Sequence, residues 1–219
     1  MISIRFHGRG GQGVVIASKL LASAFFREGW QVQAFPAFGA ERTGAPVTAF
    51  LRADHRPITA HYQVYEPDHV VVLDPVLLRT IDVTAGLRPG GWILVNTSRR
   101  PEELGLPEPC SVGACDATMI ALRHGLGTRT NPIVNTAIVG ALSALTGLVE
   151  LASVVESIPD LVPVKAEANQ AAAREAFEQV LRRPALARTQ EAGGRRQETG
   201  DRRHETGTRN EERVTTREH

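Results

Sequence analysis

The chain opens with an alternation of apolar and polar residues that changes to helical spacing. Residues 2–6, Ile-Ser-Ile-Arg-Phe, show the period of two that is typical of a strand. Apolar side chains recur at helical spacing over 14–26, and Gly29 is suited to end that helix. Residues 32–35 form a short apolar run that Pro36 closes. The pattern predicts a strand, a glycine-rich turn, a helix and a second strand.

Two continuous apolar runs predict buried strands further along the chain. They are 69–74, His-Val-Val-Val-Leu-Asp, and 92–96, Trp-Ile-Leu-Val-Asn. Such runs are typical of parallel strands covered on both faces. Weaker extended candidates are 48–51, 63–65 and 110–112, the last expected at a sheet edge.

The remaining apolar patterns predict helices. The nearly uncharged segment 135–145 is expected to be buried, either in the core or against another chain, with Asn135 and Thr136 capping its start. The other helical segments are 76–78, 116–123 with Asp116 as N-cap, 151–158 and 164–181. Strands alternating with helices predict an α/β fold. We expect a mainly parallel sheet with helices on both faces and a Rossmann-like glycine turn.

Composition changes sharply near residue 188. The last 32 residues contain eight arginines, seven acidic residues and a single sizeable aliphatic side chain, Val214. Such a segment buries too little apolar surface to offset the entropy of ordering it. We therefore expect one folded domain over 1–187 and a disordered charged tail over 188–219.

Several classes of protein are disfavoured by composition. The formal net charge of +1 does not direct the chain to nucleic acid or to an anionic membrane. The sequence contains no apolar run long enough to cross a bilayer and no signal-peptide core at its start. Two cysteines, Cys110 and Cys115, are too few for a disulfide framework, a four-cysteine zinc site or an iron–sulfur cluster. We expect a cytoplasmic protein.

The glycine-rich turn is the first candidate site. Its residues are Gly8, Arg9, Gly10, Gly11, Gln12 and Gly13, which fit G-x-G-x-x-G between a strand and a helix. The helix N-terminus offers free N–H groups to a phosphate or carboxylate. Residues 31–35 supply no acidic residue for a ribose, which disfavours simple NAD binding. Close packing of the turn, another anionic ligand and a partner loop stay open as explanations.

The second candidate site is the segment 35–47. Two prolines and two glycines exclude a regular element, yet the segment also holds two phenylalanines and the adjacent charges Glu41 and Arg42. As a loop after the second strand, it is expected at the carboxyl edge of the sheet, beside the glycine turn. It is either a binding loop in which Arg42 addresses an anion or a surface loop held to the core by its phenylalanines.

Together these segments resemble a known family. Residues 4–13 and 34–47 are similar to the gamma subunit of the 2-oxoacid:ferredoxin oxidoreductases, closest to the pyruvate synthase type. Segments 65–68, 72–75 and 131–137 extend the resemblance, which covers about residues 2–182. Pyruvate-type subunits usually have Arg-Gly after the Glu-Arg pair, where this chain has Thr43-Gly44.

The resemblance implies a subunit that is active only in a complex. That complex converts pyruvate or a related 2-oxoacid to acyl-CoA and CO2, or the reverse, using thiamine diphosphate, iron–sulfur clusters and coenzyme A. The implied partners are alpha-, beta- and delta-type (ferredoxin-like) subunits, with ferredoxin as the acceptor. This chain alone is expected to bind no cofactor and to hold no catalytic residue. Its implied contribution to the coenzyme A approach comes from the glycine turn and from Glu41, Arg42, Thr43 and Gly44.

Alternatives remain from the residues themselves. The departure at Thr43 leaves open a subunit that acts on an aryl or branched 2-oxoacid. The glycine turn alone would also suit a stand-alone Rossmann-type nucleotide-binding protein. A third alternative is a purely structural docking subunit. Asp74, at a strand end, is either a ligand contact or a turn initiator. His7 is either a ligand contact or a histidine satisfied by the backbone. The two cysteines are expected to be ordinary semi-buried thiols.

Overall fold

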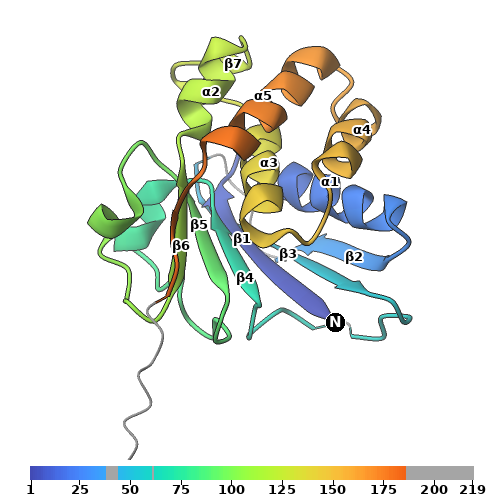
Figure 1. Cartoon of the computed structure of the whole chain (residues 1–219), viewed down its shortest axis with the longest axis vertical. Helices are drawn as coiled ribbons and strands as arrows, with labels where there is room; N and C mark the ends of the chain where they lie inside the picture. The colour runs from blue at the N-terminus through green and yellow to red at the C-terminus, as the bar shows by residue number, and fades with distance from the viewer. Residues whose placement is uncertain (38–43, 61, 186–219) are drawn as a thin grey trace, which may run out of the picture. The chain divides into compact units, whose positions relative to one another are not determined.

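The computed structural model describes residues 1–37, 44–60 and 62–185. The predicted tail over 188–219 lies outside these residues, as do Glu41, Arg42 and Thr43. The described part is built on one seven-stranded sheet with the order β2-β3-β1-β4-β5-β6-β9 (Figure 1). These strands are β1 (Ile2–Arg9), β2 (Gln31–Pro36), β3 (Pro46–Asp54), β4 (His69–Val72), β5 (Trp92–Asn96), β6 (Ser111–Cys115) and β9 (Leu181–Arg183). A small hairpin pairs β7 (Gly127–Thr128) with β8 (Asn131–Pro132).

The centre of the sheet is parallel and its outer strands are mixed. The four central strands β1, β4, β5 and β6 are parallel to one another. Strand β3 is antiparallel to both β1 and β2, and β9 is antiparallel to β6. The predicted α/β class with a mainly parallel sheet is confirmed.

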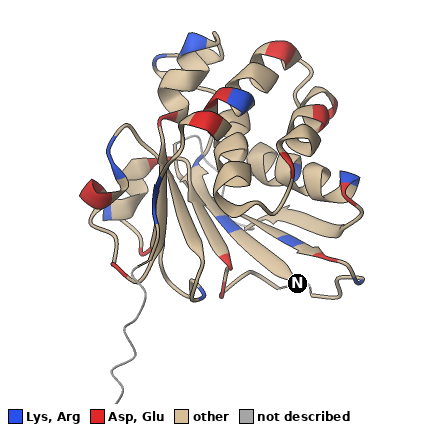
Figure 2. Ribbon diagram, viewed as in Figure 1, with Lys and Arg blue, Asp and Glu red and all other residues tan. Residues whose placement is uncertain are grey.

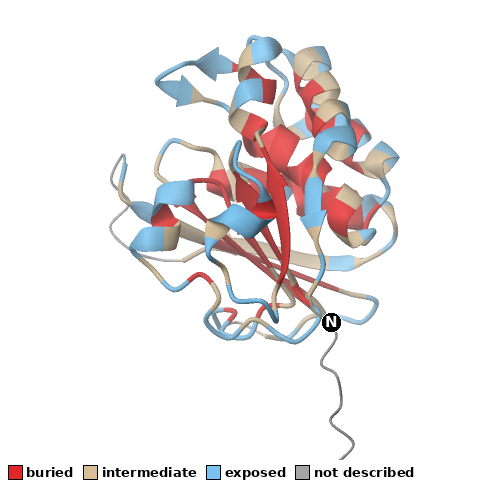
Figure 3. Ribbon diagram, turned by 60° about the vertical axis from the view of Figure 1, so that its left-hand side comes forward, coloured by how far each residue is buried: buried red, intermediate tan, exposed pale blue. Residues whose placement is uncertain are grey.

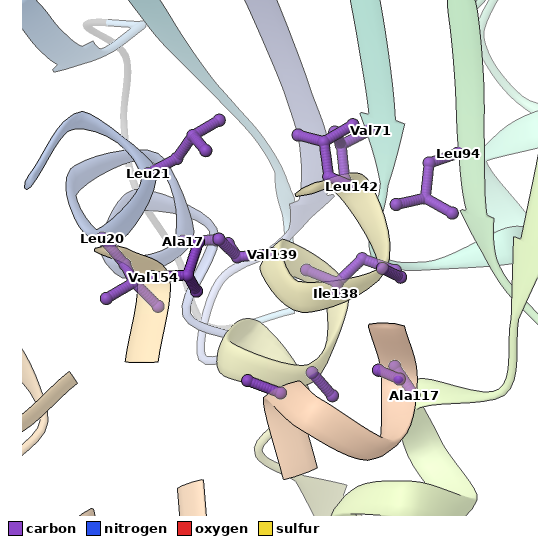
Figure 4. Close-up of a cluster of buried hydrophobic side chains, with 14 of the residues drawn as sticks. Ala17, Leu20, Leu21, Val71, Leu94, Ala117, Ile138, Val139, Leu142 and Val154 are labelled. Carbon is purple, nitrogen blue, oxygen red and sulfur yellow. The ribbon is translucent and has the colours of Figure 1, made fainter. Parts of the chain in front are cut away.

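Helices cover the two faces of the sheet unequally. The α-helices are α1 (Val14–Arg27), α2 (Ala117–Arg123), α3 (Asn135–Thr146), α4 (Leu151–Leu161) and α5 (Ala166–Gln179). They bury the larger apolar cluster, to which the sheet contributes Phe6. Figure 4 shows Val71 and Leu94 of the sheet in this cluster. The other face carries the 3-10 helices η1 (Pro75–Arg79) and η2 (Pro101–Leu104), with loops over a smaller cluster that includes Val70 and Ile93. Alternate residues of one strand thus supply the two cores, as the period of two requires.

Burial follows this arrangement. In Figure 3 the central strands and α3 are almost wholly buried, and exposure rises toward the outer turns and the β7–β8 hairpin. Helix α3 is buried from its first residue to Ser143, and again at Leu145, as its lack of charge predicts. Figure 2 places most charged residues on outer helix surfaces and in connecting loops.

Some sequence-based expectations need correction. Residues 63–65 form no strand, because the backbone there belongs to an irregular connection between β3 and β4. The strand expected over 110–112 runs over 111–115 and is not at the edge, because β9 pairs outside it. The predicted helix over 164–181 ends at Gln179, since Leu181 already belongs to β9.

Two helix starts were expected to be capped, and they differ. Asp116 is the N-cap of α2, and its Oδ1 accepts from the Met119 N–H at 2.9 Å, as predicted. The N-cap of α3 is Val134, with no side-chain capping hydrogen bond. Asn135 instead accepts from the N–H of Thr136 at 2.9 Å, and the Thr136 hydroxyl donates to Asn169 of α5 at 2.9 Å. The prediction that Asn135 and Thr136 cap the start of α3 is therefore wrong.

Candidate functional site

The glycine turn joins β1 directly to α1. Gly11 and Gly13 have φ angles of 95° and 76°, in the left-handed region that favours glycine. A Cβ on Gly13 would lie 2.8 Å from Asn135 Nδ2, and one on Gly8 would lie 2.5 Å from Val14 Cγ2. The glycines therefore allow a close approach of β1, α1 and α3 at this edge of the sheet. Part of the glycine pattern serves packing, as one of the open explanations held.

The turn lies beside the segment that joins β2 to β3. The N–H of Gly10 donates to the carbonyl oxygen of Ala45 at 3.0 Å, and the N–H of Gly44 donates to that of Gly10 at 3.2 Å. The strand register continues this contact, since Gly8 lies opposite Val47. Strands β2 and β3 thus pair as an antiparallel hairpin, and the described residues Gly44 and Ala45 lie at the carboxyl edge of β1. The expectation that the two segments share one edge holds for Gly44, and Glu41, Arg42 and Thr43 are outside the described residues.

An ion pair fixes the turn to the end of β4. Arg9 Nε lies 2.8 Å from Asp74 Oδ2, and Gln12 Nε2 donates to the same oxygen at 3.2 Å. Gln12 Oε1 accepts from the backbone N–H of Arg9 at 2.8 Å, which closes the ring of contacts. Asp74 Oδ1 caps η1 by accepting from the N–H of Val76 at 2.9 Å. Asp74 is therefore the turn initiator, and it also anchors the glycine turn; a direct contact of Asp74 with a ligand stays a prediction.

The N-terminus of α1 is open toward a small pocket. No side chain caps it, and its first turn contains no acidic residue. The pocket has a volume of about 290 Å³. Its lining is Arg9, Gly10, Gly11, Gly13, Val14, Val15, Ile16 and Val47. Free N–H groups, the positive end of the helix dipole and a partly exposed arginine are together suited to an anionic group.

His7 precedes the turn on the face of β1 opposite the α-helices. Its Nε2 accepts from Arg5 Nε at 3.0 Å, and because a guanidinium only donates, the neutral ring carries its proton at Nδ1. Burial, with the nearby charge of Arg5, lowers the pKa of His7 to about 4. Among the described residues Nδ1 has no hydrogen-bond partner. A side chain, rather than the backbone, therefore satisfies one of its nitrogens.

A second polar network, missed by the sequence analysis, lies at the end of β5. Asn96 Nδ2 donates to the carbonyl oxygen of Leu73 at 2.9 Å and to the Thr118 hydroxyl at 3.1 Å. The N–H of Thr118, in the first turn of α2, donates to Asn96 Oδ1 at 3.2 Å. The one available signal was an asparagine that ends an apolar strand. The network ties the ends of β4, β5 and α2 together.

The cysteines and acids show no metal chemistry in the part of the chain that the structure describes. Burial raises the pKa of the Cys115 thiol to about 12, and it also raises that of Cys110. Both thiols are therefore protonated at neutral pH. No group of three or more His, Cys, Asp or Glu side chains could hold a metal ion within residues 1–37, 44–60 and 62–185. No helix among the described residues is both long and apolar enough to span a membrane.

The topology disfavours dinucleotide binding at this turn. In a Rossmann unit the second strand lies beside the first, so that its end can present an acid to the ribose. Here β3 lies between β1 and β2, and β2 has the sequence Gln-Val-Gln-Ala-Phe-Pro with no acid. The class that fold and turn define is an α/β protein with an anion-suited pocket at the carboxyl edge of its sheet.

Comparison with known proteins gives the family. A family model described as pyruvate ferredoxin/flavodoxin oxidoreductase matches residues 3–179. The chain is 54% identical over 185 residues to the pyruvate/ketoisovalerate oxidoreductases common subunit gamma of Thermococcus litoralis, covering 83% of this chain and 98% of the relative. It is 48% identical over 181 residues to the pyruvate synthase subunit PorC of Methanothermobacter marburgensis, covering 82% and 98%.

A solved structure agrees with these relatives. The crystal structure of the pyruvate oxidoreductase subunit PORC of Thermotoga maritima matches with a TM-score of 0.70 and 37% identity, covering 83% of this chain and 97% of that one. The chain belongs to the pyruvate ferredoxin/flavodoxin oxidoreductase family, as a subunit of the gamma type. The resemblance to the gamma subunit that the sequence indicated is confirmed, and the hypothesis of a stand-alone Rossmann-type protein is not supported.

Proposed function

We propose that this chain serves an oxidoreductase that converts pyruvate or a related 2-oxoacid to acyl-CoA and CO2, or the reverse. Its own part is to bind the partner subunits and to guide coenzyme A along the edge formed by the glycine turn and residues 41–44. The observation that carries this proposal is the pair of hydrogen bonds joining Gly10 to Gly44 and Ala45. They bring both family-like segments to one edge, next to the open start of α1.

Thiamine diphosphate and iron–sulfur clusters do not fit this chain. It has only two cysteines, and burial keeps both protonated. The sequence contains no Gly-Asp-Gly…Asn motif for thiamine diphosphate. We assign these groups to alpha-, beta- and delta-type partners, with ferredoxin as the acceptor and the cytoplasm as the location. No step of the reaction is assigned to residues of this chain.

Coenzyme A fits through its phosphates. When bound, it supplies the thiol that takes up the acyl group. The N–H groups at the start of α1 and the guanidinium of Arg9 would hold a phosphate in the pocket. Asp74 and Gln12 hold Arg9 in place, while Gly11 leaves space for the approach, because a Cβ there would meet no atom within 4 Å. Arg42 and its neighbours are proposed to contact the same ligand.

The choice of 2-oxoacid rests on the relatives. The Thermococcus litoralis relative is named for both pyruvate and ketoisovalerate, and the methanogen relative for pyruvate synthase. Oxidation of a branched 2-oxoacid by an assembly with this chain is therefore the second candidate, in line with the departure at Thr43. Steady-state rates with pyruvate and ketoisovalerate, measured on the assembled enzyme, distinguish the two.

The ligand role is tested by placing a negative charge at the start of α1. Ile16 lines the pocket and belongs to the first helical turn. In Ile16→Glu the new carboxylate lies at the positive end of the helix dipole, which stabilises the helix, so we expect unchanged assembly. The same carboxylate repels an anionic ligand, so we expect the KM for coenzyme A to rise about tenfold. Ile16→Gln, the uncharged control of equal size, is expected to stay within about twofold of the wild type. Equal KM values for the two variants would contradict the role, and recovery of the chain without partners from its host would contradict the proposed complex.

A further inference from the structure

The two edges of the seven-stranded sheet are built differently. Strand β9 is three residues long and contains Arg182 and Arg183. Strand β2 is six residues long and contains no charged residue, so its ribbon is tan in Figure 2. Natural sheets protect free edges with short strands and charged side chains, because unpaired N–H and C=O groups attract other strands. The β9 edge has both of these protections, whereas the β2 edge has neither and carries only a proline, Pro36, at its last position.

The direction of the free backbone groups on β2 follows from one hydrogen bond. The N–H of Ala37 donates to the carbonyl oxygen of Thr48 at 2.8 Å, one step beyond the pair of Pro36 with Ala49. In an antiparallel ladder, residues that point toward the partner alternate with residues that point away. Residues 31, 33 and 35 therefore direct their backbone groups to β3. Val32 and Ala34 direct their N–H and C=O groups to the outer edge.

This edge is complementary to itself. If two β2 strands lie antiparallel with Gln33 opposite its own copy, Val32 lies opposite Ala34 in both halves. Each such pair exchanges two hydrogen bonds, so four main-chain hydrogen bonds form without a register shift. Val32 and Ala34 both belong to the apolar face that packs on the larger core cluster, so their side chains also meet on one side. No like charges oppose each other, because β2 has none.

We propose that β2 is the interface between two copies of this chain, paired across a two-fold axis at Gln33. The two seven-stranded sheets then form one continuous sheet. The helix that packs on β2 adds apolar surface at the same end of the fold, where Phe26 of α1 is 67% exposed. An isologous two-fold contact is the commonest way in which identical chains associate. This proposal concerns pairing of the subunit and does not depend on its ligand.

The register gives a test by disulfide crosslinking of the full-length chain. At the axis, a Cys at 33 faces its copy across a non-hydrogen-bonded pair, about 4.5 Å between Cα atoms, which suits a disulfide. A Cys at 31 lies about 14 Å from its copy, because it is displaced by four residues. Under mild oxidation we expect Gln33→Cys to form a covalent dimer and Gln31→Cys not to. The wild type, treated in the same way, gives the amount of crosslinking that Cys110 and Cys115 cause by themselves.

Gln33 Oε1 accepts a hydrogen bond from Arg52 at 2.9 Å, so the loss of this bond in Gln33→Cys could prevent folding. A second measurement therefore tests the proposal without this variant. Hydrogen exchange of the wild-type chain should show the amides of Val32 and Ala34 protected at high concentration and exposed on dilution. Ala34→Pro removes one outward N–H and should shift sedimentation toward the monomer, while Leu181→Lys on β9 should not.

Three outcomes overturn the proposal. The first is a chain that stays monomeric with freely exchanging Val32 and Ala34 amides. The second is crosslinking of Gln31→Cys as efficient as that of Gln33→Cys. The third is protection of the β2 amides that appears only when the other subunits are added, which assigns the edge to a strand of a different chain.

Discussion

At the scale of single residues, the glycine turn depends on one carboxylate. Asp74 is buried at the end of β4 and contacts Arg9, Gln12 and the start of η1 at once. It therefore sets where the guanidinium of Arg9 lies relative to the N-terminus of α1. A contact that holds a charged group in one place contributes about 1–3 kcal/mol, enough to affect ligand affinity measurably.

Asp74→Asn keeps the size of the side chain and removes its charge. We expect the KM for coenzyme A in the assembled enzyme to rise about tenfold, because Arg9 loses its counter-ion and its fixed position. The kcat should change less than the KM, since no catalytic residue is altered. Asp160→Asn, on the outer surface of α4, is the control and should leave both constants unchanged. An unchanged KM in folded Asp74→Asn would show that the ion pair has no role in binding.

His7 makes stability depend on pH. Its pKa of about 4 in the folded state is below the ordinary value of 6.5, so the unfolded chain binds the proton more readily. Stability is therefore fully present above about pH 6.5 and falls as the pH drops toward 4, by at most about 3 kcal/mol. His7→Gln keeps an acceptor for Arg5 but cannot titrate, so its stability should fall less over this window.

Urea unfolding at pH 7 and pH 5 measures this difference. Burial also lowers the pKa of His69, whose Nδ1 accepts from the N–H of Trp92, so part of the pH dependence should remain in His7→Gln. The test therefore compares how much the free energy of unfolding changes between pH 7 and pH 5 in the wild type and in His7→Gln. An identical change in the free energy of unfolding in both proteins would show that His7 does not titrate in this range.

At the scale of elements, α3 and α5 approach each other closely at a glycine. A Cβ on Gly140 would lie 2.1 Å from the carbonyl oxygen of Ala173, a backbone atom that moves only with its helix. Gly113 of β6 is also crowded, but its Cβ would meet Leu145 Cδ1 at 2.2 Å, the end of a flexible side chain. The two glycines therefore separate backbone crowding from side-chain crowding.

Gly140→Ala should destabilise the fold by about 3 kcal/mol or more, because α3 and α5 must move apart. Gly113→Ala should cost less, about 1–2 kcal/mol, since Leu145 can adopt another rotamer. Chemical denaturation of both variants gives the comparison. Equal losses would contradict the view that the α3–α5 backbone contact is the tighter constraint.

How far the sequence predicts the structure also depends on the element. Helix α1 and strands β1 and β5 follow from the spacing of their apolar residues, and the Asp116 cap follows from its residue type. The insertion of β3 between β1 and β2 does not, because a local pattern carries no information on which strand is its neighbour. The contacts of Asp74 and Asn96 join residues more than twenty positions apart, so only tertiary structure reveals them.

At the scale of the whole described fold, the two faces of the sheet have unequal cores. On the α-helical side, α1, α3, α4 and α5 contribute to one large buried cluster. On the other side, six buried apolar side chains lie under η1, η2 and loops. This second side also holds the buried polar groups of Arg5 and His7 on β1, which contribute less to stability than apolar contacts do. The loop-covered side should therefore open first.

Hydrogen exchange of the full-length chain measures this asymmetry. Amides of β4, β5 and α3 should exchange only through global unfolding, because both sides of these elements are buried. Amides in 75–91 and 97–110 should exchange several orders of magnitude faster through local opening, since they cover the smaller cluster. Because Asp74 is the N-cap of η1, this opening also loosens the anchor of the glycine turn. Asp74→Asn should therefore speed exchange in 75–91 and leave α3 unchanged, whereas a uniform change across the fold would contradict a separate opening of this side.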